Sequence, residues 1–232
     1  MPVTIDRSLE INPYDFASYA DYQAALVEVE SKEIALKDSR AYPAQRKAYN
    51  VNIFGAMNGY LTGSDNMVAA RNEFSQEMIE RFYSVFTLGY TQAGGKVSDL
   101  TGDSEDLQWI NARTEEEIGY IKSLFVTLKG AKGDDLTRDE LIQLAHDHAD
   151  AYTNSLDMVY SEGKMRGAKT LMLTMVGEDG SESCTDCRKR KGKRYTAKKW
   201  LAIGYPPSRA FECHGYNCAH YLITDEGKRW TQ

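Results

Sequence analysis

Four cysteines near the end of the chain are the residues best suited to bind a metal ion or to form disulfides. They are its whole cysteine complement, and they stand as "CTDC" at 184–187 and "CHGYNC" at 213–218. A two-residue gap lets two thiolates approach one ion from a tight turn, and a second pair completes a tetrahedral site of four sulfurs. Gly215 suits the sharp turn that the second pair needs. We expect a structural Zn²⁺ held by Cys184, Cys187, Cys213 and Cys218.

Two disulfides are the alternative use of these four residues. The N-terminal segment has no apolar core behind a basic start, so we expect no signal peptide and a chain folded in a reducing cytoplasm. In that compartment such spacing is more often a metal site than a disulfide clamp. His214 and His220 lie in the same segment, and either is an alternative to one sulfur. Four sulfurs leave no open position for water, so no catalysis is expected at this metal.

A basic run begins at the second cysteine of an otherwise acidic chain. The formal net charge is −6, and residues 181–232 hold 11 Lys and Arg against five Asp and Glu, which leaves 17 against 29 in residues 1–180. A zinc ion with four thiolates carries a charge of about −2, which offsets only one or two cations. We expect the others to contact nucleic acid or an acidic protein surface, the alternative being a solvated face. The candidate contact residues are Arg188, Lys189, Arg190, Lys191, Lys193, Arg194, Lys198 and Lys199.

The chain before the cysteine segment has helical patterns, and we expect the helices that they predict to position that segment. Asn12 and Pro13 indicate a helix start, and apolar residues at helical spacing continue to about residue 36 and recur over 43–61. The clearest apolar stripe runs from Met67 to Phe86 in a helix that "AGG" at 93–95 ends.

Two Thr-x-x-Glu pairs predict the starts of later helices. Thr114 with Glu117 has the form of a capping box, and the helix that it opens is expected to close at Gly130. Thr137 with Glu140 has the same form, and its helix is expected to close near residue 163.

The pattern changes after residue 167. "KTLMLTMV" is short and alternates threonine with large apolar residues, which predicts a strand. We therefore predict a mainly α protein with a helical body over 1–170 and a small, β-rich, zinc-binding module over 171–232. No stretch approaches the roughly 20 apolar residues of a membrane helix, so no membrane contact is expected.

The cysteine segment also resembles a known family. "CTDCRKRKGKRY" is similar to the C-x-x-C-x-x-x-x-G segment near the C-terminus of phage head-morphogenesis proteins of the Mu F-like minor head protein family. "HADAYTNSLDMVYSEGKMRGAKTLMLTMV" resembles the helix and strand that lead into that segment. Pro206, Cys213 and Cys218 resemble the family's returning metal-binding pair, and "YNCAHYL" resembles the N-C-R-H stretch of phage minor capsid proteins. The resemblance covers about residues 137–222.

This resemblance implies a structural protein of a tailed-phage virion, assembled in the host cytoplasm and without enzymatic activity. The implied partners are portal or capsid proteins in an oligomeric assembly, together with packaged DNA. Two other classes of function use the same module. One is a zinc-ribbon protein that binds nucleic acid, and the other is a His-Asn-His nuclease using His214, Asn217 and His220, although no upstream general base stands beside the cysteines. His146 and Asp150 share a helix face, which is better explained as the polar side of an amphipathic helix.

Overall fold

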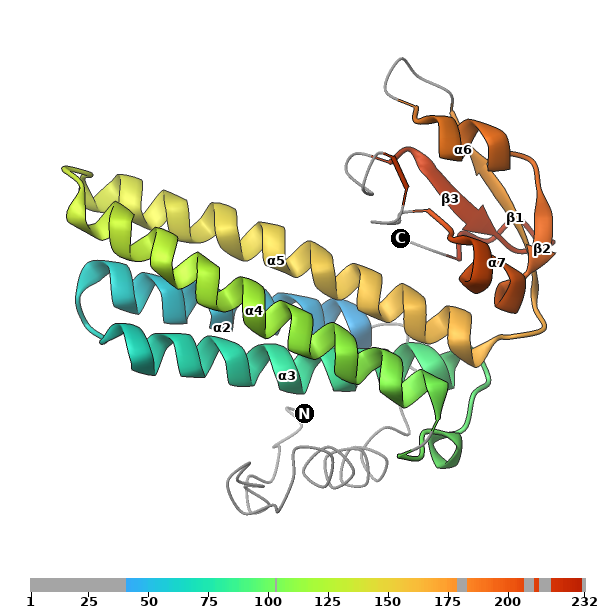
Figure 1. The fold of residues 1–232 in the computed structure, drawn as a ribbon, viewed down its shortest axis with the longest axis horizontal. Helices are drawn as coiled ribbons and strands as arrows, with labels where there is room; N and C mark the ends of the chain where they lie inside the picture. The colour runs from blue at the N-terminus through green and yellow to red at the C-terminus, as the bar shows by residue number, and fades with distance from the viewer. Residues whose placement is uncertain (1–40, 103, 179–182, 207–210, 213–217, 231–232) are drawn as a thin grey trace.

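Four long helices lie side by side, and a small module sits beside the C-terminal half of the last one (Figure 1). The computed structural model describes residues 41–102, 104–178, 183–206, 211–212 and 218–230, so the helix predicted over 12–36 lies outside the described residues. The long helices are α2 (Ala41–Thr62), α3 (Met67–Gln92), α4 (Glu105–Gly133) and α5 (Arg138–Gly167). The prediction of a mainly α fold with a small β-rich part near the C-terminus is confirmed.

Helix α3 forms where its apolar stripe was predicted. Phe74, Met78 and Phe82 are fully buried between the other helices. The Asn66 side chain accepts a hydrogen bond of 2.9 Å from the backbone N–H of Ala69, which satisfies one of the open donors at the helix start. Burial of this stripe is what holds the four helices together.

Of the two predicted capping boxes, one is present and one is not. Thr137 and Glu140 bond reciprocally at the start of α5, with Thr137 N–H donating to the Glu140 carboxylate at 2.8 Å. The prediction of a helix start at Thr114 is wrong, because α4 runs unbroken from its Ser104 cap and buries Thr114 in its middle. Glu117 instead pairs with Arg113 one turn earlier in the same helix.

The glycines predicted to end these two helices lie inside them. Helix α4 passes Gly130 and ends at Gly133, and α5 passes Gly163 and ends at Gly167. At Gly130 an added Cβ would meet nothing within 4 Å. A glycine inside a helix costs only about 1 kcal/mol, so it does not by itself end one.

Gly163 is needed where α5 crosses α3. A Cβ at position 163 would lie 2.3 Å from the carbonyl oxygen of Phe86, and one at Gly167 would lie 2.1 Å from that of Tyr90. Gly89 faces them from α3, where a Cβ would lie 2.4 Å from a backbone oxygen of α5. Only glycine lets two helix backbones approach this closely.

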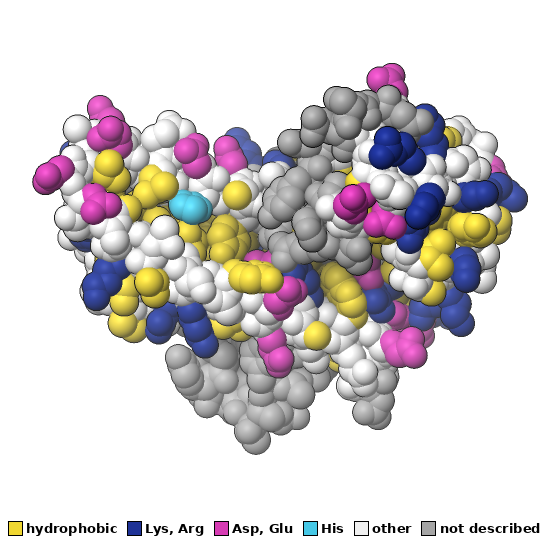
Figure 2. All heavy atoms as spheres, turned by 45° about the horizontal axis from the view of Figure 1, so that its top comes forward, with side chains coloured by type: hydrophobic (Ala, Val, Ile, Leu, Met, Phe, Trp, Pro, Cys, Tyr) yellow, Lys and Arg dark blue, Asp and Glu magenta, His cyan; other side chains and the backbone are white. Residues whose placement is uncertain are grey.

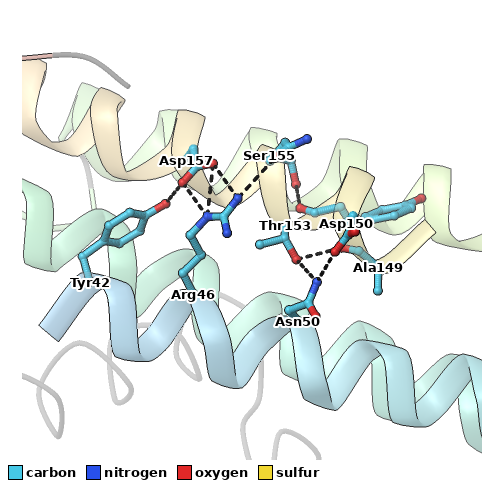
Figure 3. A network of polar contacts seen from close by, with 10 residues as sticks. Tyr42, Arg46, Asn50, Ala149, Asp150, Thr153, Ser155 and Asp157 are labelled. Atoms are coloured by element: carbon cyan, nitrogen blue, oxygen red, sulfur yellow. Dashed lines mark hydrogen bonds and ion pairs between the residues drawn. The ribbon is translucent and has the colours of Figure 1, made fainter. Parts of the chain in front are cut away.

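A polar ladder joins α2 to α5 along one side of the bundle (Figure 3). Arg46 donates to the Asp157 carboxylate at 3.0 Å, and Tyr42 donates to the same carboxylate. Burial, and then the Asp157 charge, raises the pKa of Tyr42, so the phenol keeps its proton and acts as the donor. One to two turns further along, Asn50 donates to Asp150 at 2.9 Å. These bonds fix the register of the two helices.

The module is a three-stranded antiparallel sheet with two short helices. Strand β1 (Met172–Gly177) lies in the centre, with β2 (Arg194–Thr196) and β3 (His220–Ile223) at its sides. The strand predicted from "KTLMLTMV" is therefore confirmed. Helices α6 (Thr185–Arg190) and α7 (Ala197–Ile203) connect into this sheet. Trp200 of α7 is fully buried at the centre of the module, and its indole N–H donates to the Leu173 carbonyl at 2.9 Å.

The last turns of α5 belong to the module as well as to the bundle. Met165 of α5 packs into the module core with Trp200. Tyr205 donates to the buried Glu162 carboxylate, and the Lys164 ammonium donates to the carbonyl of Trp230 at 2.6 Å. Burial lowers the pKa of Lys164 to about 8.

In the described part of the chain, none of the helices has the length and apolar character needed to cross a membrane.

Candidate metal centre

The first pair of cysteines is positioned by the start of α6. Cys184 is the N-cap residue, and its sulfur accepts the backbone N–H of Cys187 at 3.4 Å. The two-residue gap therefore becomes the first turn of a helix. Cys187 lies inside that turn and faces the module core, where its side chain is 1% exposed.

His220, the first residue of strand β3, and Cys218, two residues before it, come to the same place from the other end of the module. His220 is 2% exposed and stands opposite Gly177 in the pairing of β1 with β3. A Cβ at position 177 would lie 2.7 Å from the His220 Cα, and Gly177 has a φ of 144°. Gly177 thus lets the strand approach closely. The sequence interpretation missed this glycine, since a glycine at the end of a strand looks like the beginning of a turn.

The side chains of Cys187, Cys218 and His220 converge. Their potential ligand atoms all lie within 4.8 Å of one another, and the two sulfurs are 3.7 Å apart. Two sulfurs and an imidazole nitrogen are ligands that many metal ions accept. Cys184, Cys187 and Cys218 are not joined by disulfide bonds. This group can therefore hold a metal ion, and it contains one of the two histidines that the sequence left as alternatives to a sulfur.

Without a metal ion, the Cys187 side chain is a neutral thiol. Burial raises the pKa of the Cys187 thiol well above its usual range, and the nearby sulfurs of Cys184 and Cys218 raise it further. A buried thiolate among other sulfurs needs a positive partner, because its charge is otherwise removed from water. A metal ion provides that charge and displaces the thiol proton.

A clamp of charged groups fixes the chain at Glu212, next to residues 213–217. The Glu212 carboxylate accepts the backbone N–H of Thr185 at 2.9 Å, and the Glu212 N–H donates to Asp186 at 3.1 Å. Arg190 holds Asp186 in turn at 2.7 Å. Cys213, His214 and Asn217 lie outside the described residues, so the predicted fourth sulfur and the nuclease triplet are not placed.

The basic run divides into two groups. Arg190 and Arg194 contact the module itself, because Arg190 also donates to the Ile203 carbonyl at 3.2 Å and Arg194 donates to Asp225 at 3.0 Å. The other six side chains are exposed. They are Arg188, Lys189, Lys191, Lys193, Lys198 and Lys199. Figure 2 shows Lys and Arg side chains around the outer side of the module, at the right of the view.

His146 and Asp150, the polar pair on one helix face, lie on α5 and contact residues of α2. His146 stacks on Phe54 with a centroid distance of 3.9 Å, and Asp150 accepts from Asn50. These contacts agree with the polar helix face expected from the sequence.

Protein-family models, curated proteins and solved structures were compared with the chain, and none matches it.

Proposed function

We propose that the module is folded around one structural Zn²⁺, with Cys187 and Cys218 among its ligands. The supporting observation is the spacing of their sulfurs, 3.7 Å. Two thiolates that each lie about 2.3 Å from a zinc ion are about 3.8 Å apart at the tetrahedral angle. His220 supplies a third ligand, and the fourth is Cys184, beside Cys187, or Cys213, which follows the clamped Glu212.

A zinc ion at this place cross-links two parts of the module. It joins α6, which carries Cys187, to β3, which carries His220, across about 30 residues of intervening chain. Four protein ligands leave no position for a water molecule, so we assign the metal no catalytic role.

We further propose that the protein is a structural component of a tailed-phage virion, a minor head or head-associated protein. The support is the metal-binding knuckle of "CTDCRKRKGKRY", which resembles that of the Mu F-like minor head proteins, on a helical body. Gradient-purified particles from the source would contain the chain at a fixed ratio to the portal protein. Detection only in host lysate, with none in the particles by mass spectrometry, would refute the virion assignment.

The helical body is the expected assembly surface. We expect the full chain to co-sediment with portal or capsid protein and to keep doing so when the metal is removed by a chelator, because the bundle has its own core. Loss of co-sedimentation on chelation would place the contact in the module instead.

A second candidate function is a zinc-ribbon protein that binds nucleic acid outside a virion. The observation that favours it is the exposed group of basic side chains on the module. Its location in infected cells, on nucleic acid rather than in particles, would distinguish it from the first proposal.

A further inference from the structure

Four exposed lysines of the module carry positive charge on its outside. Lys189 lies on α6, Lys193 in the turn before β2, and Lys198 and Lys199 on α7. We call these four residues the lysine surface. No carboxylate of the described residues forms an ion pair with any of the four.

The nearby carboxylates are occupied by other partners. Asp186 pairs with Arg190 at 2.7 Å, and Asp225 pairs with Arg194 at 2.5 Å. The Glu212 carboxylate accepts the backbone N–H of Thr185. Arg190 and Arg194 thus neutralise acidic residues of the module, whereas the four lysines leave their charge at the surface.

The chemistry of this surface suits the phosphate backbone of nucleic acid. Binding that relies on bases needs exposed aromatic side chains for stacking or polar groups that reach base edges. The exposed large apolar side chains of the described residues are Val51, Val68, Tyr120, Val126 and Leu136, and all of them belong to the bundle. Tyr195, the aromatic residue within the run, packs edge-on against Trp200.

An acidic surface on a second copy of the chain is a weaker match. Some carboxylates of the bundle are paired internally, as in Arg46 with Asp157 and Arg166 with Asp106. Others are exposed, but they are separate side chains on different helices, such as Glu73 on α3, Glu115 on α4 and Asp139 on α5. A duplex, in contrast, presents one negative charge about every 1.7 Å of its axis.

We propose that the lysine surface binds the phosphate backbone of duplex nucleic acid without reading its sequence. The proposal rests on the folded module described above and does not depend on the virion assignment. It predicts binding that is insensitive to base sequence and falls steeply with salt, because each lysine–phosphate contact releases a counterion.

The test is fluorescence anisotropy of the metal-loaded full chain with a labelled 30-base-pair duplex. The variant carries Lys189→Ala, Lys193→Ala, Lys198→Ala and Lys199→Ala. Its control carries Lys47→Ala, Lys96→Ala, Lys122→Ala and Lys129→Ala, four exposed lysines of the bundle and its loops, so both proteins have the same net charge. Arg190 and Arg194 are kept, because they hold the module together.

We expect the first variant to bind at least about tenfold more weakly at low salt, while the control stays within about twofold of the parent protein. The slope of log affinity against log salt should fall by up to about 3.6 for four lost contacts, at roughly 0.9 each. Unchanged metal content and unchanged tryptophan emission would show that the module is still folded. A failure of duplex binding can then be told apart from a failure of the zinc proposal. Equal losses in both variants, or no duplex binding by the parent, would overturn the proposal. Competition by polyglutamate equal to that by duplex would assign the surface to an acidic protein instead.

Discussion

Replacing Gly163 with alanine should lower the free energy of unfolding of the bundle by about 1–2 kcal/mol. The new Cβ would lie 2.3 Å from the Phe86 carbonyl oxygen, which belongs to the backbone of α3 and cannot rotate away. The two helices must move apart, and overpacking of this kind typically costs 1–3 kcal/mol. The gain in helix propensity, about 1 kcal/mol, is smaller than the combined cost of strain and of lost packing.

Gly119 offers a matched control on a different helix. A Cβ there would meet nothing within 4 Å, so Gly119→Ala should stabilise the protein by about 0.5–1 kcal/mol. Chemical denaturation followed by circular dichroism at 222 nm measures both variants. If both substitutions change stability in the same direction and by the same amount, the close crossing of α3 and α5 is wrong.

Removing a ligand from the metal centre should have the larger effect on the module. Cys187→Ser should abolish metal binding, and with it the apparent binding free energy, roughly 10–16 kcal/mol, that small zinc modules use for folding. The few buried residues of the module core, among them Trp200, Phe211 and Leu222, are a small core for such a segment. We expect Trp200 to become exposed and its emission to shift to the red, while the helical signal of the bundle remains.

Substitutions along the module can identify the remaining ligands. Cys218→Ser and His220→Gln should resemble Cys187→Ser, since these three side chains converge. Of Cys184→Ser and Cys213→Ser, only the one that removes the fourth ligand should lose the metal completely. Tyr221→Phe is the control, because Tyr221 lies beside His220 and stacks on Arg229 without joining the group. A His220→Gln protein that keeps its full metal content would exclude the imidazole as a ligand.

The long helices and strand β1 could be predicted because their signals are local. The stripe through Phe74, Met78 and Phe82, the box at Thr137, and the alternation in "KTLMLTMV" each depend on neighbours within one or two turns. The same local pattern was misleading at Thr114, where burial in a continuous α4 outweighs the resemblance to a cap.

The composition of the metal centre depends on contacts that no local pattern encodes. His220 reaches Cys187 because β3 pairs with β1 in a register that places it opposite Gly177, 43 residues away in sequence. The role of Arg190 likewise depends on Asp186 and the Ile203 carbonyl, so the basic run could not be divided into internal and exposed residues from its sequence. The pair spacing of the cysteines was local, and it indicated the part of the chain where Cys187, Cys218 and His220 could hold a metal ion.

The most direct test of a module folded around one zinc ion is the metal content of the full chain. The protein is purified under reducing conditions, without added metal and without a polyhistidine tag. Inductively coupled plasma mass spectrometry should find one zinc ion per chain, and zinc-edge X-ray absorption should show sulfur ligands at about 2.3 Å with a nitrogen contribution at about 2.0 Å from His220. The zinc proposal would be contradicted if the chain held no metal and Cys187 and Cys218 were linked in a disulfide while the module was still folded.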